Sequence, residues 1–232
     1  MKPVCLIPAR GGSKRIPHKN THAFLGKPII SYSIDCAKQS GLFEEVIVST
    51  DDSEIAACAK NYGATVPYVR SARTSGDHSP LAQVVAEVLE ELDAEGRRPQ
   101  EICCLLATAP LCTSEDLHTG YRLLLGSDAT VVCPVASFSY PPQRALRLNA
   151  RGRVSLTQPE NNLTRSQDLE LLYHDAGQWY WIKADGFDEN CSLLGPTTTA
   201  LVLPREQVQD IDTEQDWILA EMKYRRLWPE NE

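Results

Sequence analysis

The sequence predicts an α/β fold built on a doubly wound, mostly parallel sheet. Two observations carry this prediction. Short apolar, β-branched runs alternate with helical patterns through the first half of the 232 residues, and the run at 101–106 is apolar at its core, as strands covered on both faces are. Because a βαβα alternation implies parallel strands joined by right-handed crossovers, we expect a Rossmann-like arrangement. The length suits one domain over residues 1–232.

The helices expected in the first half have recognisable ends. Pro28 suits the first position of a helix, Asp52 and Ser114 can cap the N-termini of two others, and Gly63 can end one. The strands expected in this half are 4–7, 46–49, 65–69, 101–106 and 129–135. The helices expected between them are 28–39, 52–62, 80–92 and 114–126.

The second half of the chain is less regular. Trp179, Tyr180 and Trp181 belong to an expected aromatic strand and cannot all face one way, since side chains alternate along a strand. Thr213 begins the last helix with capping-box spacing, with Asp216 in the third position. The other elements expected here are a hairpin of 145–148 and 153–157, a loop or short helix at 160–170, strands at 178–182 and 200–203, and an excursion from the domain at about 138–185.

Composition excludes several classes of protein. With 42% hydrophobic and 23% charged residues the chain is ordinary for a globular domain, and its net charge of −8 argues against a nucleic-acid or membrane-surface binder. No apolar run approaches the ~20 residues of a membrane helix, and the opening apolar stretch is too short for a signal peptide. Eight cysteines without a C-x-x-C motif are typical of buried thiols in a reducing compartment, so we expect a cytoplasmic protein.

Positive charge gathers in one short stretch, "PARGGSKRIPHKN", directly after the first expected strand. No acidic residue precedes Asp35, whereas six lysines or arginines do. Gly11 and Gly12 would let the backbone approach a ligand closely, exposed N–H groups would hold phosphate oxygens, and Arg10 can grip a phosphate bidentately. The stretch matches neither a P-loop nor a dinucleotide fingerprint. It predicts a phosphate-binding loop, with a solvated basic surface as the alternative.

An acidic pair stands near the other end of the chain, in "QDIDTE". Asp210 and Asp212 are two positions apart, so in an extended segment both carboxylates point to one side. Oxygen ligands of this kind suit Mg²⁺, which takes one or two carboxylates and completes its shell with water and substrate oxygens. The alternative is that Asp212 caps the helix that follows.

The basic stretch, read as "IPARGGSKRIPHKN", resembles the opening signature of the sugar-acid cytidylyltransferases, especially their acylneuraminate branch. The similarity covers nearly the whole chain, through "EEVIVSTDDSEIA", "LLATAPLCTSEDL", "TRSQDLE", "YHDAGQWYW" and "VQDIDTEQDW". The segments "RSQDLE" and "YHDAGQWYW" are closer to the pseudaminic acid enzymes than to those for N-acetylneuraminate. The resemblance implies a fold of the nucleotide-diphospho-sugar transferase type and a reaction in which the anomeric hydroxyl of a nonulosonic acid attacks the α-phosphorus of CTP, releasing pyrophosphate and a CMP-sugar.

The resemblance also implies roles for individual residues. The catalytic residues would be Arg10, Lys19, Asp210 and Asp212, the last two holding Mg²⁺ or Mn²⁺. The nucleotide would be bound by Ala9, Arg10, Gly11, Gly12, Ser13, Lys14, Arg15, Lys19, Asn20 and Asp77. The sugar acid would be bound by Arg165, Gln167, His174, Asp175 and Arg144, with Arg165 as the first choice for its carboxylate. A surface arginine is the alternative for Arg144, and a simple turn the alternative for His174 and Asp175.

Several alternatives stay open. N-acetylneuraminate enzymes carry a sugar-contacting glutamine where this chain has Ala107, which favours pseudaminic acid, but N-acetylneuraminate and legionaminate remain candidates; the 3-deoxy-manno-octulosonate enzymes open differently. From other classes, the chain could be a non-catalytic nucleotide-binding module, or a glycosyltransferase that uses an Asp-x-Asp motif. Members of the family are commonly homodimers, and the excursion at about 138–185 would then supply the sugar pocket or the dimer contact.

Overall fold

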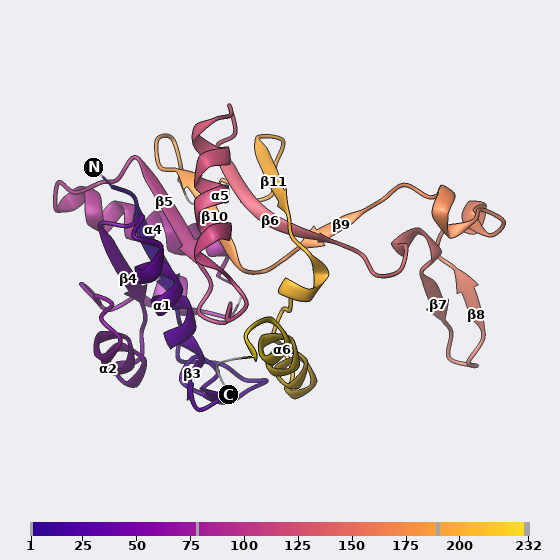
Figure 1. Ribbon diagram of the computed structural model, residues 1–232, viewed down its shortest axis with the longest axis horizontal. Coiled ribbons are helices and arrows are strands. Elements are labelled where there is room, and N and C mark those ends of the chain that lie inside the picture. Colours follow the sequence, from indigo (N-terminus) through magenta and orange to yellow (C-terminus); the bar gives the residue numbers. More distant parts are fainter. Residues whose placement is uncertain (1, 78, 189–190, 230–232) are drawn as a thin grey trace.

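The computed structural model describes residues 2–77, 79–188 and 191–229 and is centred on a seven-stranded sheet (Figure 1). Five strands run in one direction, whereas β10 and β9 run the opposite way, so the sheet is mixed but mostly parallel, as expected. The strand order is β11 (Thr198–Val202), β6 (Val131–Ser137), β10 (Trp179–Lys183), β5 (Glu101–Leu105), β1 (Val4–Pro8) and β4 (Glu45–Ser49), with β9 (Tyr173–Asp175) paired to β6.

Helices cover both faces of the sheet, because the side chains of its strands alternate between two cores. In β1, Cys5 and Ile7 face the core beneath α1, α2 and α5, whereas Val4 and Leu6 face the core beneath α4. The helices are α1 (Ile29–Ser40), α2 (Ser53–Asn61), α4 (Leu81–Ala94) and α5 (Ser114–Leu125). The central strands are therefore apolar on both faces, which is why the run at 101–106 was recognisable.

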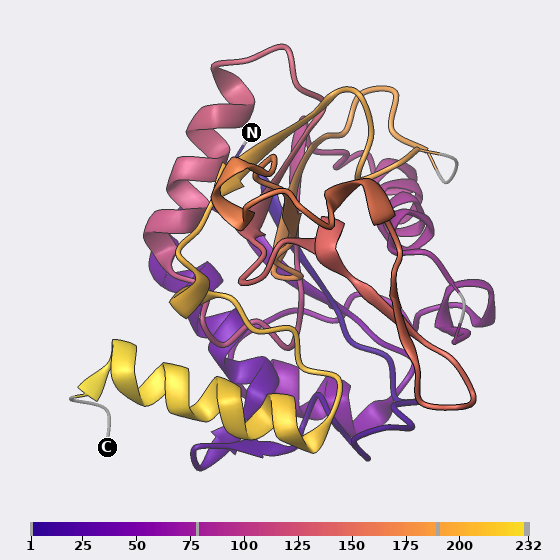
Figure 2. The ribbon, with the colours of Figure 1, turned by 90° about the vertical axis from the view of Figure 1, so that its right-hand side faces the viewer.

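The last helix, α6 (Glu214–Leu227), does not cover the sheet but lies beneath it (Figure 1, Figure 2). Its Trp217 and Ala220 pack with Ile16, Phe24 and Ile29 in a separate small core. This contact brings the end of the chain against the segment that follows β1. Because that segment contains the basic stretch, α6 fixes the distance between the two motifs that the sequence singled out.

Side-chain caps begin three of the helices. The carboxylate of Asp52 accepts hydrogen bonds from two backbone N–H groups of α2, as expected. A full capping box of Thr213 and Asp216 begins α6, also as expected. The cap of α5 is Thr113 and not Ser114, because the hydroxyl of Thr113 accepts from the N–H of Asp116 while that carboxylate accepts from the N–H of Thr113.

The aromatic strand β10 is buried on both sides. Trp179 and Trp181 face the core beneath α5, and Tyr180 faces the core beneath α4, which confirms that the three cannot share one face. Gly120 of α5 lies directly over this strand: a Cβ at that position would come within 2.4 Å of the Trp179 ring. A glycine in the middle of a helix is therefore required by packing here.

The strand expected at 65–69 does not form. Thr65 makes one bridge to Ile47, and its backbone pairs with Val46 and Val48, but the ladder stops there. Pro67 has no N–H group with which to continue it, and the chain turns away from the sheet. Conversely, no strand was expected at residues 173–175, where a turn was the alternative to a sugar contact, yet β9 pairs with β6.

Residues 138–172, between β6 and β9, form an arm that extends away from the sheet (Figure 1). The arm contains the expected hairpin, β7 (Leu146–Leu148) with β8 (Val154–Leu156), and the 3₁₀ turns Pro142–Arg144, Pro159–Asn161 and Ser166–Asp168. Elsewhere the structure has the short pair β2 (Ala23–Phe24) and β3 (Lys27–Pro28), the helix α3 (Ala72–Ser75) and the 3₁₀ turn Arg205–Gln207.

Two expectations drawn from composition can be compared with the described residues. All eight cysteines are free thiols in this structure, and six of them are buried, as expected for thiols in the interior of a domain. No helix in the described ranges is long and apolar enough to cross a membrane.

Candidate active site

The basic stretch forms a loop at the carboxyl end of β1, where open α/β sheets bind ligands. The loop is closed on itself, because the side-chain amide of Asn20 donates to the carbonyl of Arg10 at 3.0 Å. Its first glycine lies against the neighbouring strand end: the N–H of Gly11 donates to Asp51 at 2.9 Å, and a Cβ on Gly11 would come within 2.6 Å of the Asp52 carboxylate. We name residues 9–20 the basic loop.

A hollow of about 520 Å³ opens above the basic loop. Arg10 and Lys14 reach into it, and both contact the carboxylate of Asp77, Arg10 at 2.5 Å. These hydrogen bonds, from Lys14 and then Arg10, lower the pKa of Asp77 to about 2. Asp77 therefore occupies the donors that a phosphate would use. The hollow is lined by Pro8, Arg10, Ser13, Lys14, Arg15, Lys19, Asn20, Arg70, Gly76, Asp77, Ser79, Leu81, Val84 and Leu106, and we name it the first hollow.

Arg70 also lines the first hollow, and the sequence did not single it out. Only 6% of the residue is exposed, and its guanidinium donates to the hydroxyl and the carbonyl of Thr74. Burial lowers the pKa of Arg70, while the nearby Asp51 opposes that shift. A buried cation on the wall of a cavity is a natural partner for an anionic or hydrogen-bonding ligand. In the sequence Arg70 is an isolated arginine just past a strand that does not form, so no local pattern marks it.

The acidic pair lies beside the basic loop. Asp212 pairs with Arg15 at 2.7 Å and with Lys19 at 3.6 Å, and Lys19 also donates to the carbonyl of Ile211 at 2.6 Å. Ile211 is fully buried, so Asp210 and Asp212 on either side of it both face outward, as the spacing predicts. Partial burial and then repulsion from Asp212 raise the pKa of Asp210. Negative charge on Asp210 is thus not fully compensated by the protein itself.

A second hollow, of about 420 Å³, opens on the other side of the acidic pair. We name it the second hollow; it is lined by Ala136, Ser137, Ser139, His174, Arg205, Val208, Gln209, Asp210, Asp212, Asp216 and Lys223. Arg15 and Lys19 line the first hollow and Asp212 lines the second. The ion pairs between them therefore form the boundary at which a ligand in one hollow would meet a ligand in the other.

The segment that carries the acidic pair is held from two sides. Lys223 of α6 donates to the carbonyl of Val208 at 2.6 Å, to the side chain of Gln209 at 3.1 Å and to the carbonyl of Arg205 at 3.3 Å. From the sheet, the buried side chain of Gln178 donates to the carbonyl of Gln207 at 2.5 Å. Neither residue was expected to bear on the site, because the contacts join residues far apart in the chain.

The two sugar-site candidates on β9 differ in what they contact. His174 lines the second hollow, and its Nδ1 lies 2.8 Å from the carbonyl of Asp175. The carboxylate of Asp175 is instead occupied internally, since it accepts from the hydroxyl of Tyr180 and from the N–H of Gly177. Burial and the Asp175 carboxylate raise the pKa of Tyr180, so this phenol stays a donor. Asp175 thus holds the backbone beneath the hollow, while His174 faces into it.

The remaining candidates are not brought to either hollow within one chain. Arg165 pairs with Asp168 on the arm, with hydrogen bonds of 2.7 and 3.2 Å. Arg144 donates to the hydroxyl of Ser166, also on the arm, at 3.3 Å. Gln167 lies in the 3₁₀ turn between these residues. The described residues that line the hollows include none of the three.

The carboxylates of the acidic pair could supply part of the ligand shell of a divalent cation. Among the described residues no group of three or more histidine, cysteine or acidic side chains gathers as a complete metal site. Asp210 and Asp212 supply carboxylate oxygens, and burial and then repulsion from Asp212 raise the pKa of Asp210, so a cation bound there would stabilise its charged form. Two carboxylates are what Mg²⁺ uses when phosphate and water complete its shell. The pair therefore fits a cation that is bound together with a phosphorylated ligand.

Comparison with known proteins places this geometry in a family. The profile described as "Cytidylyltransferase" matches residues 4–183. A pseudaminic acid cytidylyltransferase of Campylobacter jejuni is 42% identical over 97% of both chains, and a CMP-N,N'-diacetyllegionaminic acid synthase of Legionella pneumophila is 33% identical over 95% of both. Among solved structures, CMP:2-keto-3-deoxy-manno-octonic acid synthetase complexed with CTP superposes with a TM-score of 0.68 at 19% identity, covering 99% of this chain and 100% of that one.

Proposed function

The chain belongs to the cytidylyltransferase family, and from this premise we propose that it transfers the CMP group of CTP to the anomeric hydroxyl of a nonulosonic acid. Pyrophosphate is the second product. We propose pseudaminic acid as the sugar, supported by the 42% identical relative that carries this name and by Ala107, which offers no side-chain contact of the kind a glutamine would make. The CMP-legionaminate and CMP-N-acetylneuraminate reactions are the alternatives.

The boundary between the two hollows is the observation that carries this proposal. Arg15 and Lys19 of the basic loop contact Asp212 there, so a triphosphate in the first hollow and a sugar acid in the second would meet beside the acidic pair. The sugar hydroxyl oxygen forms a bond to the α-phosphorus, and the bond from that phosphorus to the bridging oxygen of the β-phosphate breaks. The electron pair of the broken bond leaves with pyrophosphate, and the proton of the sugar hydroxyl passes to solvent.

The basic loop would bind and orient the triphosphate. Arg10 and Lys14 would exchange Asp77 for phosphate oxygens, while Lys19 stays near the α-phosphorus as it bridges to Asp212. Fixed cations and N–H donors stabilise the charge that develops on phosphate oxygens, and one such donor is typically worth about 10²–10³ in rate. Gly12 has open space around it, which leaves the backbone there accessible to a ligand.

Asp210 and Asp212 would hold Mg²⁺ or Mn²⁺ in the presence of CTP. Such a cation neutralises phosphate charge and orients the phosphate oxygens. The backbone between the two carboxylates is fixed, because Ile211 is buried there and its carbonyl accepts a hydrogen bond from Lys19. Asp212 would then be shared between the cation and the basic loop.

We further propose that the protein works as a homodimer in the cytoplasm. The arm exposes large apolar side chains, among them Leu146, Leu148, Val154 and Leu163. A second copy that covers them would also bring Arg144, Gln167 and Arg165 towards the partner's second hollow. Light scattering at micromolar concentration tests the dimer, and a monomer would refute it. The six buried, free thiols support a reducing compartment.

Pyrophosphate release tests the proposed reaction. CTP, Mg²⁺ and pseudaminic, legionaminic or N-acetylneuraminic acid are supplied in parallel to the wild type, Asp212→Asn and Glu214→Gln. Glu214→Gln is the matched control, because it removes an exposed carboxylate two residues further along. We expect turnover with pseudaminic acid, lost in Asp212→Asn and retained in Glu214→Gln. Preference for another acid would overturn the sugar assignment alone, and CTP binding without turnover on any acid would indicate a non-catalytic nucleotide-binding module.

A further inference from the structure

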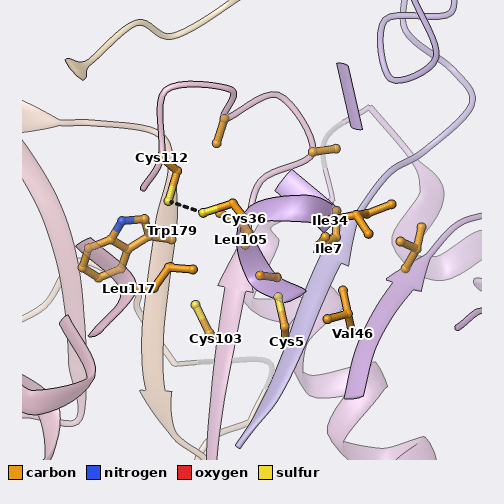
Figure 3. Packing of buried hydrophobic residues seen from close by; sticks show 14 of the residues in the cluster. Cys5, Ile7, Ile34, Cys36, Val46, Cys103, Leu105, Cys112, Leu117 and Trp179 are labelled. Atoms are coloured by element: carbon orange, nitrogen blue, oxygen red, sulfur yellow. Dashed lines mark hydrogen bonds between the residues drawn. The ribbon is translucent and has the colours of Figure 1, made fainter. Parts of the chain in front are cut away.

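Two buried thiols face each other outside the proposed active site. Cys36 lies on α1, and Cys112 lies in the segment between β5 and α5. Their sulfur atoms are 3.8 Å apart and share a hydrogen bond (Figure 3). They belong to elements that are distant in the sequence, so the fold alone brings them together.

The pair opens onto a third hollow, of about 700 Å³, between α1, the segment before α5 and the end of α6. Cys36 and Cys112 are 8% and 6% exposed and are among the residues that line it. Tyr32, Asp35 and Gln39 are on the same wall. Both residues therefore border a space that opens to solvent, whereas Cys5 and Cys103 are fully buried within the core.

We propose that Cys36 and Cys112 are a reversible redox pair that closes to a disulfide when the protein meets a hydroperoxide. In the first step the Cys36 sulfur attacks one peroxide oxygen, the O–O bond breaks, and a sulfenic acid and water form. In the second step the Cys112 sulfur attacks the sulfenic sulfur, the S–O bond breaks, and a second water leaves. Two thiols and one hydrogen peroxide thus give one disulfide and two waters, with the thiols oxidised and the peroxide reduced.

The order of the steps follows from the surroundings. The hydrogen bond with Cys36 and burial raise the pKa of Cys112 well above its usual range. Because the thiolate is the nucleophile, a thiol with a raised pKa attacks slowly, so Cys112 suits the second, intramolecular step, in which its partner is already in place. A dithiol reductant reverses the reaction by thiol–disulfide exchange.

Formation of the disulfide would shift a segment that lines the proposed nucleotide site. The sulfurs must approach from 3.8 Å to about 2.05 Å, and the irregular segment that carries Cys112 yields more readily than the helix that carries Cys36. That segment starts at Leu106, which lines the first hollow and whose carbonyl accepts from Ser33 of α1 at 2.8 Å. Because a shift of about 1 Å can cost about 10²-fold in rate, we expect oxidation to lower turnover at least about tenfold. This effect rests on the proposed function; the cross-link does not.

Peptide mapping without reduction tests the cross-link. Wild-type protein and the isosteric variants Cys36→Ser and Cys112→Ser are treated with hydrogen peroxide, with Cys58→Ser and Cys191→Ser as controls at the two partly exposed cysteines. We expect a peptide pair joined through Cys36 and Cys112 in the wild type and both controls, lost on treatment with dithiothreitol. A wild type that keeps all eight thiols, or a cross-link between other cysteines, would overturn the proposal.

Turnover, measured on the same samples, tests the coupling separately. Peroxide should lower the activity of the wild type and of Cys191→Ser, and dithiothreitol should restore it, while Cys36→Ser should resist both treatments. A cross-linked wild type with unchanged turnover would refute the coupling to the first hollow. If no preparation turns over CTP, the mapping still decides whether the redox pair exists, so the failure of the proposed function is distinguishable from the failure of this inference.

Discussion

Lys223 is expected to control catalysis by holding the segment that carries the acidic pair, and Lys223→Met tests this. The ammonium group holds the segment that carries the acidic pair through bonds to Val208 at 2.6 Å, Gln209 at 3.1 Å and Arg205 at 3.3 Å. Methionine keeps the apolar stem of the side chain but removes all three bonds. The segment would stay attached through Lys19, on the side of the basic loop, but would lose its support from α6.

The size of the effect can be worked from these contacts. A hydrogen bond to a charged group contributes about 1.5–3 kcal/mol, but the three bonds share one ammonium that is only half-buried, so water replaces part of the loss. We therefore assign about 2 kcal/mol to the whole set. Burial lowers the pKa of Lys223, which shows that the cation already gives up solvation to hold this segment. If this positioning energy is expressed only in the transition state, about 2 kcal/mol corresponds to about a 30-fold lower kcat.

The assay is pyrophosphate release as a function of CTP, sugar acid and Mg²⁺. We expect kcat to fall about 30-fold and the Mg²⁺ requirement to rise, with the KM for CTP within about twofold of the wild type, because the basic loop is untouched. Lys60→Met, at an exposed position on α2, is the matched control. An unchanged kcat, or a rise in the KM for CTP as large as the fall in kcat, would refute the reasoning. The urea midpoint checks that the variant is folded.

Three further predictions follow from single contacts. Gly120→Ala should lower the unfolding free energy by about 1–2 kcal/mol in urea titrations, because overpacking against Trp179 outweighs the better helix propensity of alanine; equal stability would contradict the packing. Arg70→Met should raise the KM for CTP at least about tenfold while that for the sugar acid stays unchanged, and the reverse pattern would place Arg70 in the sugar site. In carboxyl NMR titrations Asp77 should have a midpoint of about 2, so its ion pairs persist through the usual carboxylate range and are lost only as the pH falls through about 2. Bound CTP should move the midpoint upward, and an unchanged midpoint would mean that phosphate does not displace Asp77.

Local patterns were sufficient for most of the fold. β1 and β5 were recognisable because a strand covered on both faces is an unbroken apolar run, and α6 because its capping box is written in four consecutive letters. The direction of β10 could not be predicted, since it depends on which strands flank it and not on its own residues. The short strand β9 has no apolar run at all and pairs with the end of β6 that extends beyond its pairing with β10.

The candidate site likewise contains residues that the sequence marks and residues that it does not. The basic loop and the acidic pair are contiguous motifs, so the sequence alone predicted their chemistry. The structure brings them together, with an ion pair of 2.7 Å between the Arg15 guanidinium and the Asp212 carboxylate. Lys223 acts through partners that tertiary packing alone supplies, and the same packing brings Arg70 to the first hollow, so nothing in their immediate sequence marks either residue. Asp175 shows the converse: its residue type suits a sugar contact, but Tyr180, a neighbour on the next strand, already uses its carboxylate.

The position of the arm predicts how turnover and CTP affinity depend on protein concentration. One chain contains the basic loop, the acidic pair and both hollows, so CTP binding should not depend on association. Arg144 and Arg165, in contrast, lie on the arm with exposed apolar neighbours such as Leu146 and Leu148 and line neither hollow of their own chain, so in the proposed homodimer they would reach a sugar acid in the partner's second hollow. Dilution through the dimer dissociation constant should therefore lower turnover per chain while CTP affinity, measured by calorimetry, stays constant. Turnover per chain that is independent of concentration down to fully monomeric protein would show that the arginines of the arm take no part in recognising the sugar.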